Sequence, residues 1–158
     1  MMEKFIIIAG AVSVGKTLAS NKLISKMLSK GYVVDKYFND GSKPTFWNIL
    51  NNGKPVGGSV VLGKEDKKIA IVGYGDCIKD LDTVFAQIDF NDYYAVVCCS
   101  RTRATREVFD YFHNNILPNI DVTKTQVVPI YKDLMAHNNR DNDENISIAD
   151  TILTILEN

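Results

Sequence analysis

An eight-residue stretch near the start of the chain carries residue types that hold phosphate groups. It reads Gly10-Ala-Val-Ser-Val-Gly15-Lys16-Thr17 and matches the pattern G-x-x-x-x-G-K-[ST] without a departure. A loop of this length wraps a phosphate when its backbone N–H groups point inward, and glycines at the two bends permit that conformation. A helix beginning near Gly15 would add unpaired N–H groups and the positive end of its dipole.

The side chains at the end of this stretch have separate chemical roles. Lys16 places a positive charge on the β and γ phosphates, and the Thr17 hydroxyl takes one ligand position on Mg²⁺. We therefore expect the loop to bind a nucleoside di- or triphosphate; the alternative is a strand-to-helix turn that binds nothing. The expected cofactor-binding residues are Gly10, Ser13, Val14, Gly15, Lys16, Thr17 and Leu18.

The motif resembles that of the P-loop nucleoside triphosphate hydrolase superfamily, and in size and layout the chain is most similar to small, nucleotide-type P-loop kinases. The resemblance implies ATP or GTP with Mg²⁺, and a Walker B acid at the end of a neighbouring strand. The GTPase base-reading motif Asn-Lys-x-Asp does not follow a late strand, which favours ATP. Two departures leave the acceptor open: Ser13 stands where nucleoside monophosphate kinases usually have a third glycine, and no arginine-bearing lid is recognisable.

One apolar run leads to a candidate for that acid. Residues 69–72 are followed by Gly73-Tyr74-Gly75-Asp76, and the two glycines let the backbone pass close to a ligand while the carboxylate turns toward a metal. The apolar run at residues 93–99 ends in Cys-Cys-Ser and has no acid. Asp76 is therefore expected to hold Mg²⁺, directly or through water, together with Thr17; a helix N-cap is its alternative role.

Three arginines crowd the end of the second run. Arg101, Arg103 and Arg106 lie where a helix is expected to start, although cations there oppose the helix dipole. Guanidinium groups bind phosphate through paired hydrogen bonds, and the kinases that the chain resembles use arginines near this face to hold the acceptor or the transferring phosphate. The alternative is that Arg103 pairs with Glu107 and Arg106 with Asp110, each acid lying four residues after its arginine.

Strand-like and helix-like stretches alternate along the chain. Residues 5–8 are continuously apolar, which is typical of a strand buried on both faces. The expected strands are residues 4–9, 31–38, 56–62, 68–72, 93–99 and 125–131, and the expected helices are residues 15–29, 78–88, 102–116 and 146–156. The pattern predicts a three-layer α/β/α sandwich of P-loop NTPase type, with a mostly parallel sheet, an inserted β-hairpin turning at residues 63–67, and one domain over residues 1–158.

The amino-acid composition limits the classes of partner that we expect. The 158 residues are 46% hydrophobic and carry a net charge of −1, so neither nucleic acid nor an anionic membrane is an expected partner. Three cysteines, Cys77, Cys98 and Cys99, fit reduced thiols, and the N-terminal apolar run is too short for a membrane span or a signal peptide. We therefore expect a cytoplasmic protein; the sequence leaves its oligomeric state open.

These observations lead to two functional hypotheses. The first is a small phosphotransferase that moves the γ-phosphate of ATP to a nucleotide or another small acceptor. The alternative is a nucleotide-dependent switch or ATPase that controls a protein partner without phosphoryl transfer. The candidate catalytic residues are Lys16, Asp76, Arg101 and Arg103.

Overall fold

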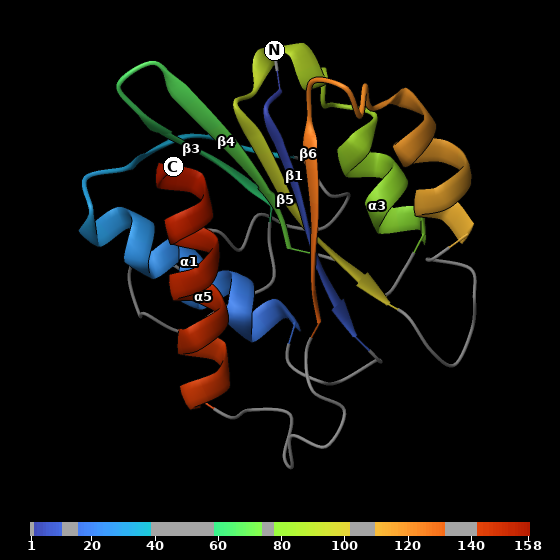
Figure 1. Ribbon diagram of the computed structural model, residues 1–158. Helices are drawn as coiled ribbons and strands as arrows, with labels where there is room; N and C mark the ends of the chain where they lie inside the picture. The colour runs from blue at the N-terminus through green and yellow to red at the C-terminus, as the bar shows by residue number, and fades with distance from the viewer. Residues whose placement is uncertain (1, 11–15, 39–58, 74–77, 102–109, 132–141) are drawn as a thin grey trace.

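A mixed sheet forms the centre of the fold (Figure 1). The computed structural model describes residues 2–10, 16–38, 59–73, 78–101, 110–131 and 142–158. The strands are β1 (Lys4–Gly10), β2 (Val33–Tyr37), β3 (Val60–Lys64), β4 (Lys67–Val72), β5 (Ala95–Arg101) and β6 (Gln126–Tyr131). The α-helices are α1 (Lys16–Ser29), α3 (Ile78–Phe85) and α5 (Asn142–Glu157), and the short helical segments are η1 (Phe90–Asp92), η2 (Phe112–Ile116) and η3 (Leu117–Asn119).

In the described residues, the six strands form one sheet in the order β2-β3-β4-β5-β1-β6. β5 pairs in parallel with β4 and β1, and β1 pairs in parallel with β6, whereas β3 runs antiparallel to β2 and β4. This confirms a mixed α/β fold with a mostly parallel sheet. β6 is an edge strand, and its residues are exposed or partly exposed. An edge strand tolerates Pro129, because the N–H that proline lacks is not needed for pairing with a further strand.

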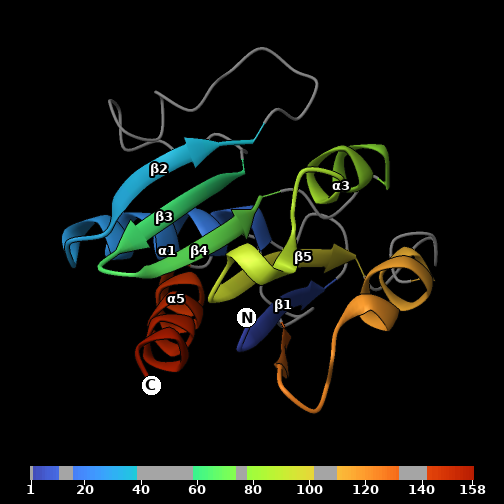
Figure 2. The same cartoon turned by 90° about the horizontal axis from the view of Figure 1, so that it is seen from above.

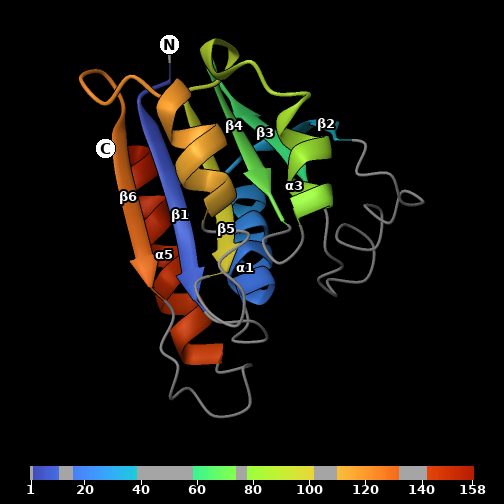
Figure 3. The same cartoon turned by 90° about the vertical axis from the view of Figure 1, so that its right-hand side faces the viewer.

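Helices lie against both faces of the sheet (Figures 2 and 3). Alternate side chains of each central strand point to opposite faces, so Phe5 belongs to one apolar cluster and Ile6 to the other. Leu23 of α1 and Ile152 of α5 complete the cluster around Ile6. Residues of α3 and of segment 110–119 complete the cluster around Phe5.

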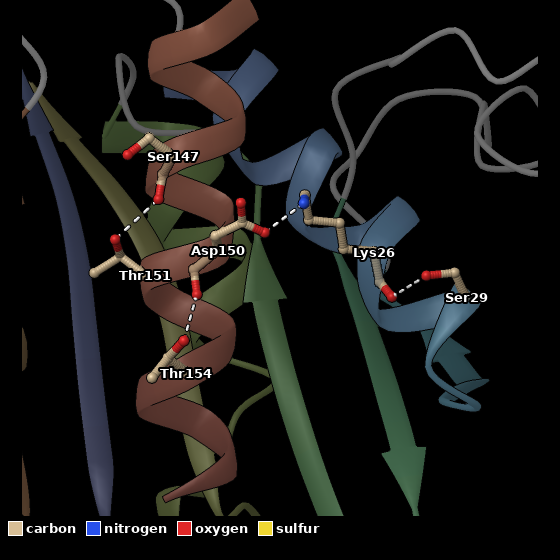
Figure 4. Close-up of polar contacts among 6 residues, drawn as sticks. All are labelled: Lys26, Ser29, Ser147, Asp150, Thr151 and Thr154. Atoms are coloured by element: carbon tan, nitrogen blue, oxygen red, sulfur yellow. Dashed lines mark hydrogen bonds and ion pairs between the residues drawn. The ribbon is translucent and has the colours of Figure 1, made fainter.

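Helices α1 and α5 lie side by side on their face of the sheet (Figure 4). The ammonium group of Lys26 forms an ion pair with the Asp150 carboxylate, which joins the exposed sides of the two helices. In the described part of the chain, no helix combines the length and the apolar character needed to cross a bilayer.

Several boundaries differ from those predicted. The hairpin turn contains only residues 65 and 66, because β3 and β4 pair as far as Lys64 and Lys67; Glu65 adopts a left-handed φ of 56°. β5 starts at Ala95 rather than at residue 93, since η1, capped by the Asp89 side chain, occupies the chain just before it. α5 starts at Asn142, four residues earlier than predicted.

The end of the helix predicted at residues 102–116 has a different helix type from the one expected. Residues 102–109 lie outside the described residues, and the turn Phe112–Ile116 is a π-helix rather than an α-helix. The 3₁₀ turn η3 follows, with Pro118 inside it, and the helical segment ends there.

Candidate functional site

The junction of β1 and α1 carries the candidate site. β1 ends at Gly10 and α1 begins at Lys16, so the Gly10–Thr17 motif runs from a strand end to the first turn of a helix, as predicted. Thr17 and Leu18 follow Lys16 in that turn. Ser13, Val14 and Gly15, which are also expected to bind phosphate, lie outside the described residues.

Local sequence explains why the junction forms there. Phe5, Ile6 and Ile8 are fully buried, which fixes β1 in the middle of the sheet. Leu23 and Met27 of α1 are also fully buried and hold the helix against the sheet. The start of α1 is thereby tied to the carboxyl end of a central strand, which is where ligands bind in open α/β sheets.

The charge pattern of α1 favours an anion at its first residue. The first turn contains Lys16 and no acidic residue. A helix N-terminus carries a positive partial charge, so an acidic side chain would normally be favoured there. A helix start of this composition favours an anion from outside the helix.

The neighbouring strand brings Arg101 to the same edge of the sheet. Arg101 is the last residue of β5 and is the register partner of Gly10, the last residue of β1. Paired strands lie about 4.8 Å apart, so the main chain of Arg101 runs directly beside Gly10, the first residue of the motif. Arg103 lies outside the described residues.

The strand that leads toward Asp76 lies further away. β4 ends at Val72, which pairs with Cys98 of β5, and β5 separates β4 from β1. Two strand spacings, about 10 Å, therefore separate the ends of β4 and β1. Asp76 therefore follows the second strand from β1 rather than a strand that pairs with β1 directly. Asp76 itself lies outside the described residues.

A buried serine that the sequence analysis did not single out accepts a hydrogen bond from the chain that follows β4. The Gly73 N–H donates a hydrogen bond to Ser59 Oγ at 3.1 Å, and the Phe38 N–H donates to the Ser59 carbonyl at 2.9 Å. Ser59 is 2% exposed and thus ties together the chain after β2, before β3 and after β4. A lone serine before an apolar strand gives no sequence signal for such a role.

The cysteines near the end of β5 are unsuited to nucleophilic chemistry. Cys98 and Cys99 are buried, and neither forms a disulfide within the described residues. Burial, with a smaller contribution from Cys99, raises the pKa of the Cys98 thiol well above its ordinary value, so the thiol stays protonated. Within the described ranges, no three His, Cys, Asp or Glu side chains gather in a way that suits a metal ion.

No protein-family model, curated protein or solved structure matches this chain.

Proposed function

We propose that the chain is a P-loop protein of the three-layer α/β/α type that binds ATP with Mg²⁺ as a single domain. The observation that carries the proposal is the complete Gly10–Thr17 pattern at the point where a buried parallel strand passes into a helix. The position of Arg101 beside Gly10, and the acid-free first turn of α1, support an anionic ligand at the same edge.

In this proposal each residue has a defined task. Main-chain amides from Ser13 to Leu18 bind the phosphates, and Lys16 offsets charge on the β and γ groups. Thr17 and Asp76 supply hydroxyl and carboxylate oxygens, the ligand type that Mg²⁺ prefers. When bound, Mg²⁺ neutralises charge on the phosphate oxygens.

We further propose that the protein is a small phosphotransferase that passes the γ-phosphate to a nucleotide or another small acceptor. The register position of Arg101 beside Gly10 supports this, because a guanidinium group close to the phosphates would stabilise charge on a transferring group. Arg103 is assigned to the same task. A switch or ATPase that controls a protein partner is the second candidate. The lack of a disulfide at Cys98 and Cys99 is in keeping with a cytoplasmic location.

An ADP-release assay separates the two candidates. The protein with ATP and Mg²⁺ is assayed alone and with each member of a panel of nucleoside monophosphates and sugars. Acceptor-dependent turnover that Arg101→Ala lowers by about 100-fold is the expected result for a phosphotransferase. Turnover that stays equally slow with every acceptor, together with a nucleotide-dependent change in oligomeric state, would instead support the switch.

A further inference from the structure

A hollow lies at the end of the sheet opposite the β1–α1 junction. It has a volume of about 650 Å³ and is lined by residues of α3, η1, η2 and η3 and of the turn after α3. η1 precedes β5 and η3 precedes β6, so the hollow lies toward the amino ends of these strands. The volume falls within the range of small-molecule pockets, and the motif at the β1–α1 junction does not account for it.

Aromatic and aliphatic side chains form the apolar part of the lining. Phe85 and Phe90 meet edge to face with ring centroids 6.3 Å apart, and Phe85 also packs against Phe112 at 5.8 Å. Phe90 and Ile88 are only partly buried, so some apolar surface faces the hollow. This surface suits the carbon stem of a ligand.

The polar part of the lining is negative. Asp82 accepts a hydrogen bond from the Tyr111 hydroxyl at 3.1 Å, and Asp89 accepts one from the Asn91 N–H at 3.0 Å. Each contact uses one carboxylate oxygen and brings no positive charge. Among the described residues, the lining contains no lysine, arginine or histidine, and neither carboxylate forms an ion pair.

The end of α3 adds to this negative charge. Helix C-termini carry a negative partial charge and favour cations, yet the last turn of α3 contains Asp82 and no basic residue. The helix end and both carboxylates therefore give the lining a negative character, and the lining also contains aromatic rings. A lining of this character favours a cation, and aromatic faces attract cations as well.

We propose that this hollow binds a small organic cation: an ammonium or guanidinium group carried on a short apolar stem. The charged group lies between Asp82 and Asp89, and the stem packs on Phe85 and Phe90. This assignment is independent of nucleotide binding at the β1–α1 junction.

The test is an amide NMR titration with butylguanidinium chloride at constant ionic strength, with butylurea as the uncharged ligand of the same shape. We expect saturable shifts at Ala86, Asn91 and Asn115 with butylguanidinium and a Kd on the order of 1 mM. Butylurea should give shifts that do not saturate over the same range. No saturable shifts with butylguanidinium, or equal affinity for both ligands, would overturn the proposal.

Substitutions at the two aspartates test where the cation binds. Asp82→Asn and Asp89→Asn keep a hydrogen-bond acceptor at each position and should each weaken binding about threefold, the range of an exposed ion pair. Asp110→Asn removes an exposed carboxylate that does not line the hollow, and should leave the Kd unchanged. The same Kd in all three variants would overturn the assignment.

Discussion

At the residue scale, Lys4 is a charged side chain that the fold buries. Only 8% of it is exposed, and its ammonium group donates a hydrogen bond to the Ile155 carbonyl in the last turn of α5. The Tyr94 ring centroid lies 5.8 Å from Lys4 Nζ. The last turn of α5 has no basic residue of its own, so β1 supplies the cation that a helix C-terminus favours.

Replacing this lysine should destabilise the fold. Lys4→Met keeps the length of the side chain but removes the donor and the charge, so we expect the free energy of unfolding to fall by about 1–2 kcal/mol. Urea unfolding followed by circular dichroism measures the change. Lys30→Met, at an exposed position, serves as the control and should change stability by less than about 0.5 kcal/mol. Equal effects of the two substitutions would contradict this role for Lys4.

Tyr111 predicts a dependence of stability on alkaline pH. Burial first, and then the hydrogen bond and charge of Asp82, raise its pKa above the ordinary value of 10.0. The folded protein therefore retains this proton at a pH where the unfolded chain has lost it, so stability falls as pH rises above 10.0. Tyr111→Phe has no such proton. At neutral pH its free energy of unfolding should be about 1 kcal/mol lower than that of the wild type, and this difference should shrink above about pH 10.

The measurement is urea unfolding of the wild type and of Tyr111→Phe between neutral pH and about pH 11. Tyr131→Phe controls for the removal of a phenol group, because Tyr131 is 71% exposed. This control should match the wild type throughout. A deficit of Tyr111→Phe that stays constant or grows with pH would refute the interpretation.

At the scale of elements, a Schellman motif ends α1. The Tyr32 N–H donates to the Met27 carbonyl at 3.1 Å, and the Gly31 N–H donates to the Leu28 carbonyl at 3.3 Å. Gly31 has a φ of 93°, a conformation that residues with a Cβ adopt only at a cost. The sequence analysis predicted a helix that ends before Gly31, and the structure confirms it.

Gly31→Ala should therefore cost about 1–2 kcal/mol of stability. The cost is conformational rather than steric, since a Cβ at this position would meet only Lys64 Cε, at 3.9 Å. Gly63→Ala is the matched control: its Cβ would lie 3.8 Å from the Lys67 carbonyl oxygen, and its φ is ordinary. Thermal unfolding of both variants checks the difference, and a Gly31→Ala variant as stable as Gly63→Ala would contradict it.

Local sequence patterns predicted where helices and strands lie along the chain better than how the strands are ordered in the sheet. Continuous apolar runs gave the positions of β1, β4 and β5 to within two residues, because a strand buried on both faces has little polar alternation. The strand order was not predictable from these runs. β5 lies between β4 and β1 because of pairing between distant segments. The π-helix at Phe112–Ile116 was also missed, since its buried residues are four apart, as in an α-helix.

The same distinction applies to the candidate site. The sequence motif correctly placed Gly10 at a strand end and Lys16 at a helix start, because both depend on adjacent residues. The pairing of Arg101 with Gly10 and the bridge through Ser59 depend on the folded sheet, and no local pattern reports them.

At the scale of the whole molecule, the two ends of the sheet have different chemistry. The carboxyl end of β1 leads to the proposed nucleotide site, and the amino ends of β5 and β6 adjoin the negative hollow. α1 starts at the first site and packs along its length against the sheet and α5, so a ligand held there should stabilise the whole domain. A ligand at 100 times its Kd adds about 2.7 kcal/mol to the free energy of unfolding.

Calorimetric titration with ATP and Mg²⁺ tests the central claim most directly. The wild type should give a saturable heat with one site per chain, and Lys16→Ala should lose it. Lys22→Ala, which removes a lysine from the same helix outside the motif, should bind as the wild type does. No heat with either ATP or GTP in the presence of Mg²⁺, or the same Kd for Lys16→Ala and the wild type, would contradict a nucleoside triphosphate site at the β1–α1 junction.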